Sequence, residues 1–556
     1  MTPHRARILL VLLIALTLLA CQAQRPPAAG DPEGVHYSPV AQITPANVAR
    51  LRVAWKFHSG APGSEAIPVI ADGVLYLTQP NGVFALMPET GKLLWKYLLD
   101  GMAIRGLSYW PGDGQTPPRV FAGVRDQLIA IDAKTGRPAE GFGTNGLIDL
   151  KTGISDGVSN ARIVLTSPPA IYRNLVITGG SNGEGAPSAG AYGDIRAWDA
   201  RTGKLVWTFH TVPRDGEPGS DTWPPGGWKN RSGTNTWGFF SVDAERGLLF
   251  APTGSPTADF YGADRKGNNL YGNSLVALDA ATGKLRWYRQ LVHHDLWDYD
   301  VAAAPALIEV RRGGSAIPAV AQITKMGLLF VFDRLTGEPI FGVEERPVPR
   351  SNVPGEASSP TQPFPVKPPP LARNTFRAEE MYSLTPEHKA FCEDLFARNQ
   401  LQISPPYTPF PVDRNVLLFP STLGGGNWGG VSYDPARHYV FVNVMNVGQF
   451  GRMTEGKPDA GSGGRYVRKS EYGAYARFWN PESKIPCSAP PFGELVAVNA
   501  DTGEIAWKSP LGAVASLEAR GFKNTGSVNI GGSLATAGGL VFIAATNDSR
   551  LRAFDA

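Results

Sequence analysis

Along most of the chain, short runs of alternating apolar and polar residues are separated by turns rich in aspartate and glycine. One unit recurs: an apolar strand, an Asp-x-x-Thr-Gly turn and a second strand that ends in tryptophan. Copies lie at residues 84–95, 129–136, 197–207, 275–287, 331–337 and 497–507, and the chain stops inside a further copy at residues 552–556. Aspartate and glycine favour tight turns, and alternation favours half-buried strands. The pattern therefore predicts an all-β protein built from repeated strand units.

A further apolar strand precedes several copies, as at residues 73–77, 175–178 and 539–543. Repeats of about 40–50 residues that hold several strands each are typical of propeller blades. We predict an eight-bladed β-propeller with tryptophan-docking blades, with seven blades as the alternative. The long interval between Gly337 and Gly503 has room for two blades, one of which we expect to begin at residues 427–435.

The two ends of the chain carry incomplete units. Residues 51–55 form a strand-like segment that ends in Trp55, and no turn precedes it. We predict that this segment completes the blade that residues 552–556 begin. Whether the sequence is cut short at its C-terminus is left open.

Two stretches interrupt the repeats. Residues 346–370 are rich in proline, and residues 451–480 are rich in glycine, arginine and tyrosine. They are either loops over the ligand-binding face of the propeller or solvated surface excursions, and the sequence does not choose between these alternatives.

The N-terminus has the pattern of an export signal. Arg5 and Arg7 precede an apolar run over residues 8–20, which is short for a membrane span of about 20 residues. Leu-Leu-Ala before Cys21 resembles the lipobox of bacterial lipoproteins, and the alternative is an ordinary signal peptide with an incidental cysteine. We expect residues 1–20 to be the signal peptide, 21–40 a flexible linker and 41–556 the propeller. A lipidated Cys21 would place the protein in the periplasm, anchored to the cell envelope.

Charge and cysteine content narrow the function. A formal net charge of +4 over 556 residues, without a run of basic residues, gives no reason to expect nucleic-acid binding. Beyond Cys21, the cysteines are Cys392 and Cys487. Export predicts a disulfide between them, and two buried free thiols are the alternative. The chain contains no Cys-x-x-Cys-His motif for covalent haem.

Residues 292–300, Val-His-His-Asp-Leu-Trp-Asp-Tyr-Asp, interrupt the repeated pattern directly after Trp287. Two histidines, three aspartates and a tryptophan in one short segment indicate a place where a scaffold carries chemistry. Together with the blade repeats, this segment resembles the pyrroloquinoline-quinone (PQQ) dehydrogenases, which are eight-bladed propellers that oxidise alcohols or aldose sugars. The resemblance covers nearly the whole mature chain.

The resemblance implies a role for each matching residue. Asp298 corresponds to the catalytic base and Lys325 to the cation that contacts the quinone oxygens, while Trp237 corresponds to the indole on which the quinone stacks. Glu184 corresponds to a ligand of Ca²⁺, which Asp298 and Ser255 would also bind. The other expected PQQ contacts are Glu65, Arg105, Thr166, Asn427 and Trp428. Each of these residues could instead have a purely structural role, as a carboxylate in a turn, a member of a surface ion pair or a tryptophan of the core.

Two features depart from the family pattern. Ser255 stands where methanol dehydrogenases have an asparagine ligand, and a hydroxyl is a poorer metal ligand than an amide carbonyl. The stretch before Arg105 has neither the cysteines nor the histidine that cover the second face of the quinone, so that face is either open or covered by Met102.

Lys325 and the histidine pair favour the membrane glucose dehydrogenase type over the methanol type. We expect a quinoprotein that oxidises a sugar or another hydroxyl compound and passes electrons to a separate acceptor, either a cytochrome or a membrane quinone. The alternatives are a non-enzymatic propeller lipoprotein that scaffolds envelope assembly and a PQQ alcohol dehydrogenase.

Overall fold

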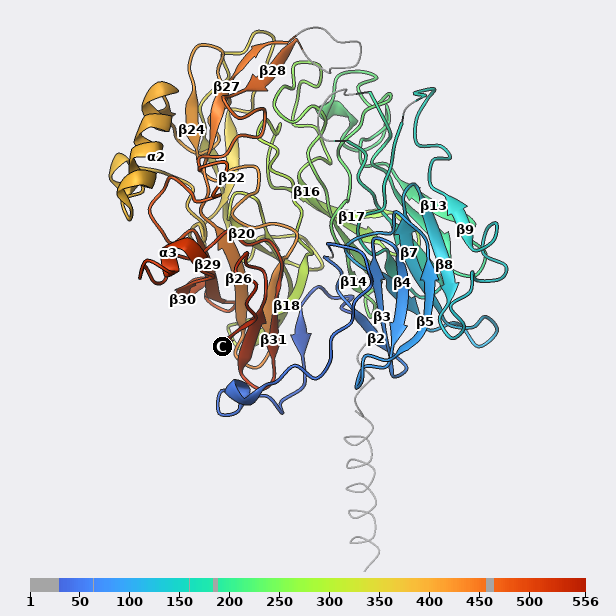
Figure 1. Cartoon of the computed structure of the whole chain (residues 1–556). Helices are drawn as coiled ribbons and strands as arrows, with labels where there is room; N and C mark the ends of the chain where they lie inside the picture. The colour runs from blue at the N-terminus through green and yellow to red at the C-terminus, as the bar shows by residue number, and fades with distance from the viewer. Residues whose placement is uncertain (1–29, 64, 160, 184–188, 457–464) are drawn as a thin grey trace, which may run out of the picture.

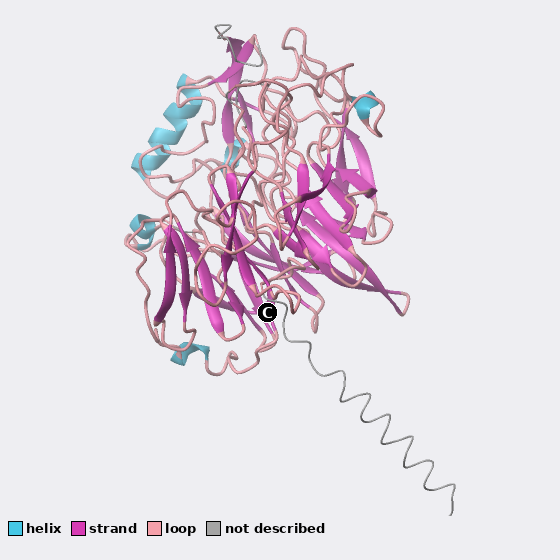
Figure 2. Ribbon diagram, turned by 90° about the vertical axis from the view of Figure 1, so that its right-hand side faces the viewer, coloured by secondary structure: helices cyan, strands magenta, loops and turns pink. Residues whose placement is uncertain are grey.

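The computed structural model describes residues 30–63, 65–159, 161–183, 189–456 and 465–556. Antiparallel sheets fill the lower half of Figure 1, and long loops with two smaller sheets lie above them (Figures 1 and 2). Among the described residues, no helix has the length and apolarity to cross a membrane.

The first four sheets each contain four strands that follow one another along the chain. Their bounds are β2 (Val69–Ala71), β3 (Val74–Gln79), β4 (Gly82–Leu86) and β5 (Leu93–Leu98); β6 (Ser108–Trp110), β7 (Arg119–Val124), β8 (Gln127–Asp132) and β9 (Leu147–Asp149); β10 (Ala170–Tyr172), β11 (Leu175–Thr178), β12 (Ile195–Asp199) and β13 (Leu205–Phe209); and β14 (Ser241–Asp243), β15 (Leu248–Pro252), β16 (Ser274–Asp279) and β17 (Leu285–Gln290).

The second half of the chain is less regular. A three-stranded sheet holds β18 (Ala306–Arg312), β19 (Ser315–Ile323) and β20 (Leu329–Asp333). Two four-stranded sheets complete the lower half: β25 (Val431–Asp434), β26 (Tyr439–Met445), β29 (Gly493–Asn499) and β30 (Glu504–Pro510), then β1 (Tyr37–Ser38), β31 (Ser533–Thr536), β32 (Leu540–Ile543) and β33 (Arg552–Asp555).

The smaller upper sheets and the helices come from insertions. They are the hairpin β21 (Val343–Pro347) and β22 (Thr361–Pro365), the sheet of β23 (Gln402–Ile403), β24 (Val416–Leu418), β27 (Gln449–Glu455) and β28 (Tyr466–Lys469), the helices α2 (Pro386–Arg398) and α3 (Ala515–Glu518), and 3₁₀ turns at Val48–Arg50, Ser220–Thr222 and Ala378–Glu380.

The innermost strands of neighbouring sheets contact one another in the order β2, β6, β10, β14, β18, β25 and β31. The all-β propeller architecture is therefore confirmed, and β25 begins a blade where the sequence predicted one. These contacts link seven sheets of the described residues, so eight blades stay a prediction.

The predicted Asp-x-x-Thr-Gly turns have a single geometry. In the turn at Asp279, its Oδ1 accepts the amide of Thr282 at 3.0 Å, and its carbonyl accepts the amide of Gly283 at 2.8 Å. Gly283 has a φ of +70°, which favours glycine because a side chain is strained in that region. The same arrangement recurs at Asp132, Asp199 and Asp333.

Each docking tryptophan lies flat against the turn glycine of the next sheet. A methyl group on Gly337 would come within 2.7 Å of the ring of Trp287, and the indole N–H of Trp287 donates to the carbonyl of Arg334 at 3.1 Å. Trp95 packs in the same way on Gly136, and Trp207 on Gly283. The repeat therefore joins neighbouring sheets as well as forming each one.

The apolar core lies between adjacent sheets. One cluster joins the first two sheets through Tyr76, Val83, Val120 and Ile129, and similar clusters fill the interval between each later pair. Because both faces of a middle strand are buried, β7 and β15 are buried over their whole length, and β15 is apolar throughout.

The N-terminal segment differs from the prediction. Residues 51–55 form no strand, although Trp55 docks on Gly91 as the repeat predicts. Instead, β1 pairs in parallel with β31, with Tyr37 opposite Ala535. Part of the expected linker, residues 21–40, therefore belongs to the last sheet.

The physical reason is a set of backbone hydrogen bonds to the inner strands. The carbonyls of residues 32, 33, 35 and 36 accept amides from four successive inner strands, in the pairs Val242 to Pro32, Leu307 to Glu33, Tyr433 to Val35 and Ala535 to His36. The segment also lines a cavity of about 110 Å³ among the first residues of the inner strands. It ties those strands together across the middle of the molecule.

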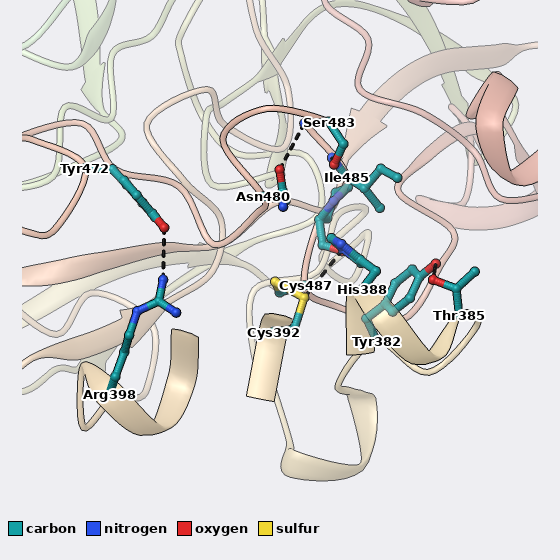
Figure 3. Close-up of a disulfide and its surroundings, with 11 residues drawn as sticks. Tyr382, Thr385, His388, Cys392, Arg398, Tyr472, Asn480, Ser483, Ile485 and Cys487 are labelled. Carbon is teal, nitrogen blue, oxygen red and sulfur yellow. Dashed lines mark hydrogen bonds between the residues drawn. A yellow bond between two sulfur atoms is a disulfide. The ribbon is translucent and has the colours of Figure 1, made fainter. Parts of the chain in front are cut away.

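The upper layer is fastened by a disulfide between Cys392 on α2 and Cys487, which confirms the predicted pairing (Figure 3). His388, one turn earlier on α2, places its Nε2 3.2 Å from the carbonyl of Pro486. Tyr382, Phe419 and Phe478 pack around the disulfide in one buried cluster.

The tryptophan–glycine contacts predict a position-specific loss of stability. We expect Gly337→Ala to lower the free energy of unfolding by about 1–3 kcal/mol more than Gly314→Ala, because the added methyl overpacks Trp287. Gly314 is a matched control, since its φ of +81° carries the same backbone strain but its surroundings are open. Urea unfolding of both variants measures the difference, and equal losses would contradict the docking role.

Candidate functional site

The predicted cofactor contacts occupy equivalent positions in successive sheets. Glu65, Thr166, Trp237 and Asn427 each lie four residues before the start of an innermost strand, which is β2, β10, β14 and β25 respectively. Because all these strands enter the ring from the same end, the loops before them converge there. The repeat thus brings together residues that are far apart in the sequence.

Arg105 is the centre of the first group. Its guanidinium carbon lies 5.2 Å from the ring centroid of Trp237 and 5.3 Å from that of Trp428, and its Nε is 3.0 Å from Glu65 Oε2. Thr166 Oγ1 donates to the carbonyl of Trp237 at 3.3 Å. These five side chains are partly exposed, so they can contact a ligand.

Asn427 has a local role in this structure. Its Nδ2 donates to the carbonyl of Leu423 at 2.8 Å, and its Oδ1 accepts the amide of Trp428 at 2.6 Å. The amide side chain thereby fixes the loop that presents Trp428. Its predicted contact with the cofactor stays a prediction.

Lys325 is the centre of the second group. Its Nζ donates to Asp298 Oδ1 at 2.9 Å, to the carbonyl of Asp298 at 2.9 Å and to Asp300 Oδ2 at 2.8 Å. All three residues are at most 5 % exposed. Three ammonium hydrogens therefore meet three oxygens in a place with little water, which strengthens each interaction.

The charges in this group set its protonation. Burial alone would raise the pKa of the Asp300 carboxyl, but attraction to Lys325 lowers it below its ordinary value. Burial alone would lower the pKa of the Lys325 ammonium, but Asp298 and Asp300 raise it above its ordinary value. Lys325 and Asp300 are therefore both charged at neutral pH.

The loop that carries Asp298 is fixed by Asp295. Asp295 Oδ1 accepts the amide of Trp297 at 2.9 Å, and Oδ2 accepts the amide of Tyr299 at 2.7 Å. Trp297 and Tyr299 are buried and stacked on each other. Asp298 lies between them with a φ of +60°, an uncommon backbone conformation that is frequent at functional sites.

Ser255 connects this loop to the preceding sheet. Its amide donates to Asp300 Oδ1 at 2.6 Å, and its hydroxyl contacts Asp295 Oδ2. Asn273 Nδ2 donates to the same hydroxyl at 3.1 Å. The hydroxyl thus already has two protein partners, and its role as a metal ligand stays a prediction. Glu184 lies outside the described residues.

Some residues of the site were not predicted. Asp300 is the second carboxylate of Lys325, although the sequence pattern only included it in the acidic segment. Asn235 Oδ1 is buried without a hydrogen-bond partner among the described residues, and it lies with Asp300 Oδ1 around Gly254. Met102, in contrast, is buried in the core of the first two sheets, which excludes it as a cover for the site.

The two groups of side chains are neighbours. The amide of Gly425, two residues before Asn427, donates to the carbonyl of Lys325 at 2.5 Å. Gly238, which follows Trp237, packs against the carbonyl of Ala302, two residues after Asp300. A ligand on the Trp237–Arg105 group would therefore lie beside the Lys325–Asp298 pair.

The donor chemistry fits a flat anionic cofactor and a hard cation. Two indoles flank a guanidinium, and the buried indole N–H of Trp237 has no acceptor within the described part of the chain. The carboxylate of Asp298 and the unpartnered amide oxygen of Asn235 are the oxygen ligands that Ca²⁺ prefers.

A family model described as PQQ, glucose/ethanol/alcohol dehydrogenase, beta-propeller domain, matches residues 26–556. The chain belongs to this family. It is 33 % identical to a quinate/shikimate dehydrogenase (quinone) of Acinetobacter baylyi, over 94 % of the chain and 71 % of that protein. It is 32 % identical to the glycerol dehydrogenase large subunit of Gluconobacter oxydans, over 97 % of the chain and 79 % of that protein.

Among solved structures, the quinohemoprotein alcohol dehydrogenase from Comamonas testosteroni superposes with a TM-score of 0.66 at 26 % identity, over 97 % of the chain and 73 % of that protein. Relatives of this PQQ-family chain also include quinoprotein glucose dehydrogenases. The resemblance predicted from the sequence is confirmed.

The Lys325 group predicts a large stability effect. We expect Lys325→Met to lower the free energy of unfolding by about 3–5 kcal/mol, because it leaves two buried carboxylates without their counter-ion. Lys508→Met is the control, since the exposed Lys508 donates only to the carbonyl of Leu371 and should change stability by less than about 0.5 kcal/mol. Chemical denaturation measures both, and an Lys325→Met variant as stable as the control would refute the ion-pair assignment.

Proposed function

We propose that the protein is a quinoprotein dehydrogenase that oxidises a hydroxyl compound with PQQ and Ca²⁺, with Asp298 as the base. The observation that carries the proposal is the buried Asp298–Lys325–Asp300 group directly beside the half-buried Arg105–Trp237–Trp428 group. Family membership supports the same conclusion, because its members are oxidoreductases that act on CH–OH donors.

PQQ, when bound, supplies an electrophilic carbon that accepts a hydride. The residues that would hold it are Trp237 and Trp428, whose indole faces suit a planar ring system, and Arg105, which would form charge-assisted bonds to its carboxylates. Glu65 and Thr166 support this group through Arg105 and Trp237.

The residues that would hold Ca²⁺ are Asp298 and Glu184, with Ser255 as the weaker predicted ligand. The amide oxygen of Asn235 adds a candidate that suits calcium better than a hydroxyl. A cation there would act as a Lewis acid on the carbonyl that accepts the hydride.

Asp298 would take the hydroxyl proton of the substrate while hydride leaves the adjacent carbon. Its carboxylate is anionic in the ion pair with Lys325, which is the form that accepts a proton. Lys325 would stabilise the negative charge that develops on the neighbouring oxygens. Asp300 would keep the ammonium in place while Asp298 changes protonation.

The proposal favours the glucose-type branch, because Lys325 and the pair His293–His294 match it. Electrons would then pass to a separate acceptor, a cytochrome or a membrane quinone.

Reconstitution with PQQ and Ca²⁺, followed by dye reduction with a panel of sugars and alcohols, tests the proposal. We expect Asp298→Asn to retain PQQ and to lose turnover by at least about 100-fold, because the base is removed and the pocket is not. Asp413→Asn, an exposed carboxylate next to Arg414, should keep full activity. Failure to bind PQQ would favour the scaffold alternative, and an active Asp298→Asn variant would show that the base is misassigned.

We also propose that the protein is periplasmic and lipid-anchored through Cys21, which lies outside the described residues. The buried disulfide supports export, because such bonds persist in oxidising compartments.

Growth with a labelled fatty acid should label the wild-type protein and leave a Cys21→Ser variant unlabelled. A Lys523→Ser variant should remain labelled. Equal labelling of the wild-type and Cys21→Ser proteins, or none in either, would refute the anchor.

A further inference from the structure

Two arginines of the segment that follows β27 both contact Gln449, and Gln449 Nε2 donates to the hydroxyl of Tyr299, the residue after Asp298, at 3.2 Å. Arg468 is buried on β28, where its guanidinium lies over the rings of Phe410 at 4.0 Å and Phe260 at 4.7 Å. Its Nη1 donates to Gln449 Oε1 at 2.8 Å, and its Nη2 donates to the carbonyls of Phe450 and Ala476. All these acceptors are neutral, so no described hydrogen bond of Arg468 pairs its charge with a carboxylate.

Arg477 differs from Arg468 in its partners. Its guanidinium lies over Trp479, 5.3 Å from the ring centroid, and its buried Nε has no hydrogen-bond partner among the described residues. Burial lowers the pKa of the guanidinium, and the nearby charge that raises it is that of Asp298. Arg477 therefore belongs to the electrostatic surroundings of the proposed base, and among the described residues its Nε has no acceptor.

The backbone around Arg477 is held in place. The backbone of Arg477 forms an isolated antiparallel β-bridge with Gln449. The amide of the next residue, Phe478, donates to the carbonyl of Gly448 at 2.8 Å, and its side chain is fully buried. The amide of Cys487 donates to the carbonyl of Phe478 at 3.0 Å, and the disulfide ties Cys487 to α2 (Figure 3). The position of this arginine is thus built into the fold.

The same segment covers the loop after Ser255. The hydroxyl of Tyr475 donates to Asp259 Oδ2, and its ring packs edge-on against Phe260 at 5.2 Å. The segment therefore contacts the loop after Ser255 through Tyr475. Through Gln449 it also contacts Tyr299, the neighbour of Asp298.

Other buried arginines direct their terminal guanidinium nitrogens to protein acceptors, although the Nε atoms of Arg119 and Arg265, like that of Arg477, have no partner among the described residues. Arg334 pairs with Asp243 at 2.9 Å and donates to the carbonyls of Ile308 and Ala319. Arg196 donates to the carbonyls of Leu150 and Thr152. A guanidinium that is partly removed from water without such acceptors is costly, and an anionic ligand would offset that cost.

We propose that Arg477 binds a carboxylate of the substrate, so that the protein acts on a hydroxy acid whose carbinol lies at Asp298. The inference rests on the proposed function and names its substrate class. The planar guanidinium fork suits a carboxylate, and its charge offsets the repulsion between a substrate anion and Asp298. Arg468 adds to the positive potential behind it.

The test compares quinate, a cyclic hydroxy acid, with inositol, a neutral cyclic polyol. On the protein loaded with PQQ and Ca²⁺, we expect Arg477→Gln to raise KM for quinate about 10- to 100-fold with a smaller change in kcat, because a charge-assisted contact to the substrate is lost. The kcat/KM for inositol should stay within about twofold. Arg477→Lys should restore part of the quinate affinity.

Lys484→Gln is the matched control, since Lys484 lies over the same indole at 5.4 Å. It should leave quinate kinetics unchanged. Calorimetric titration of quinate and inositol into the wild-type and Arg477→Gln proteins gives a readout that is independent of turnover, and thermal melting confirms that each variant is folded.

The outcomes separate the two claims. Dye reduction with inositol but no preference for quinate, or an equal loss for both compounds in Arg477→Gln, overturns the arginine inference and leaves the dehydrogenase standing. No turnover with any donor overturns the proposed function, and the calorimetric comparison then still decides whether Arg477 binds the carboxylate.

Discussion

The contact between a tryptophan of one sheet and a turn glycine of the next is the constraint on which the rest of the structure depends. Trp287 occupies the space that a side chain at Gly337 would fill, and its indole donates to the same turn. The contact therefore fixes the spacing and orientation of neighbouring sheets. Once these are fixed, the loops before the inner strands converge at one end, which is where Arg105, Trp237 and Trp428 meet.

The site contains ionised groups that the scaffold buries away from water. These groups differ in how far opposite charges and hydrogen bonds from the protein offset the cost of burying them. Lys325 is fully compensated by Asp298 and Asp300, so this group is stable in the absence of a ligand. Asp295 is buried with its oxygens directed to two amides and to Ser255, and burial raises its pKa. Asp295 thus fixes the conformation of the loop, and the loop positions Asp298 as the proposed base.

Local signals in the sequence were sufficient for the parts of the fold that repeat. The turn at Asp279 and the docking of Trp287 follow from residue types within a few positions of each other. The pairing of β1 with β31 carries no such signal, because two residues that pair in parallel across almost the whole chain show no periodicity. Residues 51–55 had the composition of a strand that would pair with β33, but they form none, and residues 37–38 join the opposite edge of that sheet, next to β31.

In the candidate site, too, some residues could be predicted from local sequence motifs and others depend on tertiary contacts. Asp298, Lys325 and Trp237 were predicted from motifs, and the structure brings Lys325 to Asp298. The partner Asp300, the unpartnered oxygen of Asn235 and the direction of the Ser255 hydroxyl depend on side-chain orientation across three loops, which no local pattern encodes. Arg477 was hidden for a further reason, since its significance depends on a buried Nε that has no hydrogen-bond acceptor in the described part of the chain.

Substrate choice in this site is therefore best understood as a balance of charge. The Asp298–Lys325–Asp300 group has a formal net charge of −1 and the two arginines have +2, so with a neutral polyol one positive charge among these five residues has no counter-charge. A substrate that carries its own carboxylate would bring the missing anion to the side of the site where the two guanidiniums lie. It would also leave the Lys325–Asp298 pair intact, so that the base remains available for the carbinol proton.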